Sequence, residues 1–588
     1  MSSGNRTLTT GLFSSTTGTV RSIAFGTGEI NVTGNNATVY IMTTLTGFTY
    51  TGTSKLNATY SGAIGVRYVF HGSSTGTGSS ESNAININIT AGTDIVDMVN
   101  TGNLYVRNLN FTGFTGLLSD IRYTIFGNLT FSSGMALAAS TFATTFAGTS
   151  GTQLITTNGQ TLDFPITQDG VGGTVQLQDN LTITNTSSTS YVLTNGALDL
   201  NNFNLSTAGR FSSDNSNVRS INFGTTGKVL LTGSAVTLFF MNTATNFSYT
   251  GTSYVGLTAN SSTGIRSFGM GSIAGGTESN ALSFYVTAGT DEVSFGSQAK
   301  ALNLNFTGFS GSLGAASNTI YGNIVLSSAM NTGSGGTWTL AATAGTQQIT
   351  TNGTTLNRTI EQNGVGGTVQ LQDALTVGAT YTLTVSNGTF DTNGQTISGP
   401  AEVTLATGTV GLKNAFTVPV TQTSGNVTLF ANTSTTTYTL TAGTLNLNGF
   451  NLTASTQFST NNSNVRSINF ASFGKVILSG SGTVWDATTA TNLTTAGSGM
   501  ISLTSASAKT FAGGGASYRT ISQDGVGTLT LSGANTFDTI DNTVQPTTVT
   551  FPAGATTSVS NFMLSGTSGN LVTINSNSPG TRFTLAQI

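Results

Sequence analysis

An arginine that recurs in three copies of one motif is the first candidate for binding chemistry. The second copy reads "SNVRSINFGTTGKVLLTG" from Ser216 to Gly233, and the arginines of the three copies are Arg21, Arg219 and Arg466. A guanidinium group presents five N–H donors and suits carboxylate or phosphate. One hypothesis is therefore three equivalent sites for an anionic sugar or a lipopolysaccharide phosphate. The alternation of neighbouring residues favours a second one, in which the arginine lies on the outward face of a strand and donates to carbonyls at a turn or an interface.

Two acidic residues also recur. Glu81 and Glu278 both begin the tetrapeptide Glu-Ser-Asn-Ala, which the third copy lacks. They could mark a loop that contacts glycans, but the pattern favours solvated loop acids. Asp94 and Asp291 follow Thr-Ala-Gly-Thr in the same two copies and are interpreted as turn residues.

Catalytic and metal-binding patterns are not apparent. Asp169 and Asp524 lie in the motif Gln-Asp-Gly-Val-Gly, where a carboxylate could serve as the general acid of a glycosidase. The matching residue of the second copy is Asn363, an amide that cannot transfer a proton in this way. His71 is the only histidine and there is no cysteine, so we expect a histidine at a strand end or in a loop. The sequence predicts no catalytic residue, no metal site and no cofactor.

The composition narrows the class of protein. Only 7% of the 588 residues are charged and the net charge is −3, so no basic surface is expected to attract nucleic acid. No run approaches the roughly 18 apolar residues of a membrane helix, and we expect no membrane insertion. The first residues lack a basic start followed by an apolar run, so no secretory signal is expected. Abundant Thr, Ser, Asn and Gly with β-branched residues indicates β structure.

Long repeats organise the chain. "QDGVGGTVQLQD" at Gln168 returns as "QNGVGGTVQLQD" at Gln362, and a shortened form begins at Gln523. The distance from the Val-Arg-Ser motif to the Gly-Val-Gly motif is nearly the same in the first two copies and less than half as long in the third. A stack of similar layers can lose layers in this way, whereas a closed core could not.

The fold expected from these repeats is an all-β, elongated parallel β-solenoid, or β-helix, of tandem modules. Short alternating runs recur at close spacing between Gly-containing turns. We expect three strands and roughly 20 to 30 residues per coil, with neutral side chains forming ladders on the outside. In the repeated motif, Val218, Ile221 and Phe223 are predicted to face inward, and Gly227 and Gly233 to mark turns. The expected modules are 1–215, 216–373, additional coils over 374–462, a short module over 463–533, and C-terminal coils or a cap over 534–588.

A family resemblance is strongest over Tyr438–Ile588. The segments "GTLNLNGFNLTASTQFSTNNSNVRSINFASFGKVILSG", "GTLTLSGANTFDTI" and "NFMLSGTSGNLVTINSNSPGTRFTL" resemble β-solenoid tail-fibre-like and structural proteins of marine bacteriophages. The resemblance implies a virion appendage, often homotrimeric, that presents a surface to envelope glycans of the host. Its motifs are structural and carry no catalytic residues.

The function expected on these grounds is that of a non-enzymatic virion structural protein, a bacteriophage tail fibre or another surface appendage. It would lie in the tail or outer surface of the virion. Expected partners are further copies of the chain, with a trimer favoured, other virion proteins and host surface glycans. One alternative is a bacterial adhesin or extracellular filament at the cell surface. Another is a polysaccharide depolymerase with two acids facing across a groove.

Overall fold

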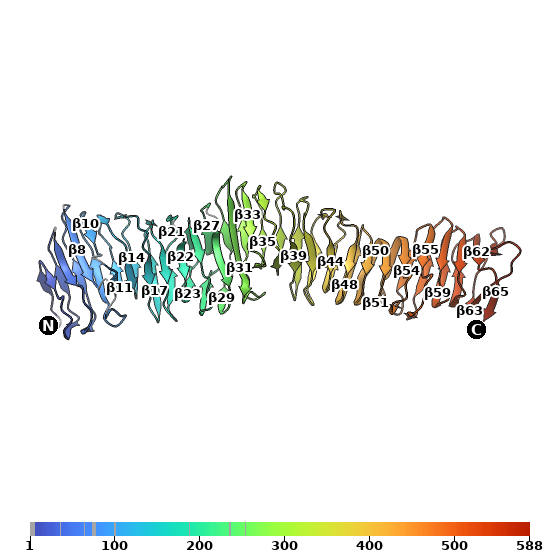
Figure 1. Cartoon of the computed structure of the whole chain (residues 1–588), viewed down its shortest axis with the longest axis horizontal. Coiled ribbons are helices and arrows are strands. Elements are labelled where there is room, and N and C mark those ends of the chain that lie inside the picture. The colour runs from blue at the N-terminus through green and yellow to red at the C-terminus, as the bar shows by residue number, and fades with distance from the viewer. Residues whose placement is uncertain are drawn as a thin grey trace. The chain divides into compact units, whose positions relative to one another are not determined.

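The computed structural model describes residues 6–35, 37–63, 65–72, 78–98, 102–186, 189–234, 237–252 and 254–588. All regular elements of these residues are strands, β1 to β65, and they pair in parallel from the first pair to the last. The chain forms two compact units, Met1–Leu302 with Phe306–Ser312, and Asn303–Asn305 with Leu313–Ile588. Each unit is a parallel β-solenoid, so the expected fold class is confirmed (Figure 1).

Three strands make up a typical coil of the first unit. One coil consists of β19 (Ile166–Gln168), β20 (Thr174–Leu177) and β21 (Leu181–Ile183). They pair with β22 (Thr189–Leu193), β23 (Gly196–Asp199) and β24 (Asn204–Thr207) of the following coil. The three stacks of strands are called the first, second and third face below. Successive coils therefore repeat the same three faces along one axis within the unit.

Coil length varies because corners vary while strands stay in register. On the second face of the first unit, Thr174 lies opposite Ala197, which in turn lies opposite Ser220, so two successive coils are equally long. In the second unit β47 (Val403–Leu405) pairs with β49 (Val420–Gln422), and Thr404 lies opposite Thr421. The predicted coil length is confirmed for the first example and is too long for the second, where the corners are shorter.

Aromatic rings stack along the inside of the first face. Tyr191, Phe211 and Phe239 come from three successive coils, with ring centroids 5.6 and 5.3 Å apart and planes within 5° of parallel. All three side chains are buried. Burying such a ring contributes roughly 1.5–3 kcal/mol, and offset stacking adds about 0.5–1.5 kcal/mol per pair. Strand spacing brings equivalent side chains together in every coil, so one inward aromatic position produces a continuous stack.

Asparagines form a neutral ladder across coils of the first unit. The Nδ2 of Asn57 donates to the Oδ1 of Asn31 at 2.7 Å, Asn88 donates to Asn57 at 2.9 Å, and Asn110 donates to Asn88 at 3.3 Å. An amide is both donor and acceptor, so a column of amides can satisfy itself where a column of like charges would repel. The expected ladder of uncharged side chains is confirmed here.

The repeated motif is only partly oriented as predicted. Ile221 and Phe223 are buried, but Val218 is 77% exposed, and its counterparts Val20 and Val465 are 93% and 77% exposed. The inward prediction for Val218 is wrong because this residue lies in the corner before β26 (Arg219–Asn222), where the alternation of the strand has not begun.

The two glycines of the same motif mark close backbone approaches. A Cβ on Gly227 would lie 2.4 Å from the carbonyl oxygen of Phe223, and one on Gly233 would lie 1.8 Å from that of Ala208. Neither position can hold a side chain without moving backbone, because real Cβ contacts do not come that close. Glycine is therefore required by packing at both turns.

The third Gln-Asp-Gly-Val-Gly motif lies on another face than the first. The first copy follows β19 on the first face, whereas Gln523 ends β59 (Ser517–Gln523). β59 pairs with β57 (Met500–Leu503), and β57 pairs with β54 (Lys475–Leu478). The sequence of β54 matches that of β27 (Lys228–Leu231), a strand of the third face. The motif thus encodes a strand and its corner, independently of the face.

Candidate functional site

The guanidinium group of Arg219 is buried at the corner where β26 begins. Its Nε donates to the Oγ of Ser213 at 2.8 Å and to the carbonyl of that residue at 3.2 Å. Nη1 donates to the carbonyls of Asn217 and Thr245, both at 2.9 Å. Nη2 donates to the carbonyls of Ser213 at 2.8 Å and Thr243 at 2.6 Å. All three nitrogens are engaged with groups of the chain itself.

Arg466 repeats this network in the second unit. Nε donates to the Oγ1 of Thr460 at 2.6 Å, Nη1 to the carbonyls of Asn464 and Thr491 at 2.7 and 2.8 Å, and Nη2 to those of Thr460 and Thr489 at 2.6 and 2.7 Å. Removal from water lowers the pKa of Arg466, as it lowers the pKa of Arg219 to about 10. The carbonyl dipoles around each group offset part of this desolvation.

Arg21 occupies the same corner of the first copy but is half-buried. It donates to the carbonyls of Thr17, Thr19 and Thr44, with Thr19 at 3.2 Å. Burial lowers its pKa as well. The three arginines predicted as one set therefore form one kind of corner, and they donate to carbonyls as the second hypothesis expects. The outward orientation predicted for them is wrong for Arg219 and Arg466. Both side chains are buried because several carbonyls converge at the corner and accept hydrogen bonds from the guanidinium group.

Glu81 and Glu278, the other two candidates, are part-buried residues of turns. The Oε2 of Glu81 accepts hydrogen bonds from the Oγ1 of Thr149 at 2.9 Å and from its backbone N–H at 3.3 Å. The backbone carbonyl of Glu81 accepts from Nη2 of Arg107 at 2.9 Å. Glu81 therefore ties its turn to a corner that lies much further along the chain.

Two buried ion pairs were not predicted. The Nε of Arg67 lies 2.7 Å from the Oδ2 of Asp94, and the Nε of Arg266 lies 2.7 Å from the Oδ2 of Asp291. All four side chains are fully buried. Both aspartates lie at bends, as expected, but their carboxylates face a strand of the preceding coil. The signal was present in the sequence, since both long modules place an arginine about one coil before the aspartate.

Other cations are buried in the same manner. The Nζ of Lys509, at the start of β58 (Lys509–Ala512), donates to the carbonyls of Ser505 at 2.7 Å and Gly527 at 3.1 Å. Burial lowers its pKa to about 8. Arg358 packs over the ring of Trp338 at 4.4 Å. A chain with only 18 Lys and Arg residues thus places several of them inside, where they serve backbone carbonyls or aromatic rings.

His71 ends β8 (Val66–His71), as predicted, but it is buried. Its Nδ1 lies 3.1 Å from the Oη of Tyr40, and its Nε2 lies 3.2 Å from the carbonyl of Asn83. Burial lowers the pKa of the imidazole to about 4. No group of three His, Cys, Asp or Glu side chains that could hold a metal occurs in the residues that the structure describes.

The acids of the glycine motifs are engaged with neighbouring side chains. Asp169 accepts from the Nδ2 of Asn195 at 2.7 Å. Burial opposes the ionisation of Asp524, but hydrogen bonds from Ser502, Ser522 and Thr543 outweigh it and lower the pKa of that carboxyl. A glycosidase acid requires a raised pKa, so this environment does not favour acid catalysis at Asp524.

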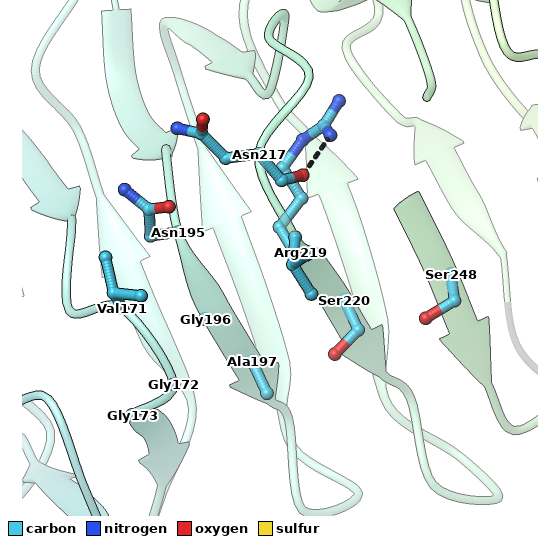
Figure 2. A pocket seen from close by; sticks show the side chains of 11 residues that line it. Val171, Gly172, Gly173, Asn195, Gly196, Ala197, Asn217, Arg219, Ser220 and Ser248 are labelled. Atoms are coloured by element: carbon cyan, nitrogen blue, oxygen red, sulfur yellow. Dashed lines mark hydrogen bonds between the residues drawn. The ribbon is translucent and has the colours of Figure 1, made fainter. Parts of the chain in front are cut away.

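A surface pocket lies on the second face of the first unit, beside the Arg219 corner. Its volume is about 490 Å³, and it is lined by residues of four successive coils, among them Val171, Gly196, Val218 and Ser248. Figure 2 shows Val171 at the left of the pocket, Asn195 and Asn217 above it, and Ser220 and Ser248 on neighbouring strands to the right. The dashed bond in that view runs from Arg219 to the carbonyl of Asn217. The pocket therefore lies on the outer side of this corner, and the guanidinium of Arg219 fills the inner side.

No helix among the described residues has the length and apolar character needed to cross a membrane. Comparisons with protein-family models, with curated proteins and with solved structures each gave no match to this chain.

Proposed function

We propose that this protein is a non-enzymatic structural component of a bacteriophage virion, a tail fibre or another appendage of the virion surface. The observation that carries the proposal is the stack of parallel coils, in which buried arginines donate hydrogen bonds to backbone carbonyls of the chain itself. Such a stack supplies a repetitive scaffold whose length can change by whole coils without loss of register. A structural role for the retained arginines agrees with it, since Arg219 and Arg466 donate to their own corners.

The outer surface supports the same proposal. It carries ladders of neutral side chains, as between the half-buried Asn88 and Asn110, and it presents little charge to solvent. A neutral, hydrogen-bonding surface suits contact with polysaccharide better than with nucleic acid, which demands a cationic patch. We place the protein in the tail or outer surface of the virion, assembled with copies of itself, as a trimer, or with other virion proteins, and facing host surface glycans.

Immunogold electron microscopy of purified phage particles, with mass spectrometry of their proteins, tests the proposal. Gold label on tails or on the particle surface, together with peptides from both units, is the expected result. Peptides confined to bacterial envelope or filament fractions would overturn it and favour a bacterial adhesin.

A further inference from the structure

Two exposed valines lie in the surface pocket beside Arg219, on either side of the coil that carries Gly196, and the space between them is called the slot below. Val171 and Val218 are 67% and 77% exposed and precede β20 and β26, which lie two strands apart on the second face. Two strand spacings put about 9.6 Å between β20 and β26. Gly196 belongs to the coil between these two strands. The slot is therefore one coil wide and has a valine on each side.

The floor of the slot is bare backbone. Gly196 has φ +78°, and a Cβ there would lie 2.4 Å from the carbonyl oxygen of Gly173. A side chain at this position is excluded both by conformation and by space. The floor therefore cannot be filled from within the coil, and the two valine walls stay apart.

The slot offers neutral polar groups and no available charge among the residues that line it. The guanidinium of Arg219 donates to the carbonyls of Thr245 and Thr243, away from the slot. The nearest acid, Asp169, lies outside the lining, is exposed, and accepts from Asn195 through one carboxylate oxygen. The hydroxyls of Ser220 and Ser248 line the pocket, and neither makes a hydrogen bond with any described residue. The carboxylate of Asp169 beside Asn195 disfavours an anionic ligand. The lining suits a neutral ligand that carries a small apolar group for the valines and hydroxyl or amide groups for the polar side chains.

We infer that this slot binds a neutral N-acetylated sugar residue of a surface polysaccharide. The acetamido methyl group fits between Val171 and Val218. The NH2 groups of Asn195 and Asn217 already donate to Asp169 and to the carbonyl of Thr194, so their side-chain oxygens are left to accept from the N–H of the acetamido group. The ring hydroxyls face Ser220 and Ser248. The inference rests on the proposed function, which places host glycans against this surface, and it names the class of sugar.

The chain carries its own comparison sites. Val365 is 68% exposed in the matching corner of the second unit, but by strand register Thr409 stands where the second valine would be. Val465 is as exposed as Val218, and Thr423 stands in place of its partner. Each of these corners has one valine wall. They test whether an exposed valine suffices or whether the opposed pair is needed.

Saturation-transfer NMR on the full chain tests the inference, with N,N′-diacetylchitobiose as probe and cellobiose as the neutral analogue that lacks acetamido groups. We expect transfer to the acetyl methyl protons and millimolar affinity, typical of a single shallow subsite. The double variant Val171→Ser/Val218→Ser removes apolar surface from both walls, so affinity should fall about fivefold or more. The control Val365→Ser/Val465→Ser should bind as the parent protein does.

Four outcomes would overturn the inference: no transfer to the parent protein, equal transfer to cellobiose, undiminished binding by the slot variant, or equal loss in the control. Particle labelling decides the proposed function separately. A virion protein that fails the NMR test would retain its proposed role without this sugar, and a sugar-binding protein absent from virions would show the reverse.

Discussion

Arg266 and Asp291 form a fully buried bidentate ion pair, with Nε to Oδ2 and Nη2 to Oδ1 both at 2.7 Å. The arginine also donates to the carbonyls of Ala259 and Ala288, so the pair joins a strand to two corners. Arg67 and Asp94 repeat the pair earlier in the first unit. A lone charge in this position would have no water to solvate it.

Removing one partner should therefore be costly. Asp291→Asn is expected to leave an uncompensated buried guanidinium and to lower the local free energy of opening by about 3–5 kcal/mol. Hydrogen–deuterium exchange resolved by mass spectrometry should show the loss in the strands around Arg266. Asp538→Asn breaks the half-exposed pair with Arg519, 2.8 Å apart, and is the control, with an expected change of about 0–1 kcal/mol. Equal effects of the two variants would contradict the prediction.

The corner arginines should be needed for local stability. Arg219→Met leaves the carbonyls of Ser213, Thr243 and Thr245 without their donor, at about 1–3 kcal/mol for each buried group that finds no water. Faster amide exchange in β26 and the adjoining corner is expected. Arg210→Met is the matched control: this part-buried arginine lies over the ring of Phe240 and makes one long bond, 3.4 Å, to the carbonyl of Thr237, so its loss should change exchange little. A wild-type exchange pattern in Arg219→Met would refute the role of this arginine as a corner support.

The single histidine should make the first unit sensitive to acid. The pKa of His71 is lowered to about 4 by burial, while an unfolded histidine titrates near 6.5. Between these values the unfolded chain takes up a proton that the folded chain refuses, so stability is present above about pH 6.5 and is lost as pH falls toward 4. The shift corresponds to roughly 3 kcal/mol.

NMR of the imidazole protons can follow this group directly, because no other histidine is present. The expected result is a neutral ring until about pH 4, with opening of β5 (Thr38–Met42) and β8 in the same range. In His71→Gln the opening of these strands should depend less on pH. A midpoint near that of an unfolded histidine would contradict the burial of the ring.

Lys509 should make stability depend on pH in the alkaline range. Burial lowers the pKa of its ammonium to about 8, below the value near 10.5 of the unfolded chain. Between pH 8 and 10.5 the unfolded chain holds the proton and the folded chain has released it, so the contribution of Lys509 to the free energy of unfolding rises with pH. The difference between the parent protein and Lys509→Met, measured by urea unfolding, should change across this window. A constant difference would show that Lys509 keeps its proton when folded.

The solenoid could be predicted from the sequence because its physical cause is local and repeated. Alternating residues such as Ile221 and Phe223 bury one side of each strand, and motifs that survive the loss of whole blocks require stacked layers. Polar columns such as Asn57 over Asn88 follow from the neutral composition once the coils stack.

The site could not be predicted to the same depth because corners do not follow the alternation of strands. Val218 and Arg219 are adjacent in the motif, yet the valine is exposed and the arginine is buried. Alternation predicts opposite faces for the two residues, with the valine inside and the arginine outside, and the structure has the reverse. The carbonyls of Thr243 and Thr245 that accept from Arg219 belong to the next coil. That environment exists only after the coils have stacked.

The sequence by itself determined the all-β class, the repeated corners and the scarcity of charge. Only the tertiary structure decided that Arg219 faces inward, that Asp291 meets Arg266, and that Val171 and Val218 form the two walls of one slot. The physical reason is that strand register brings together residues that lie a whole coil apart in the chain, and register depends on corner lengths that differ from coil to coil.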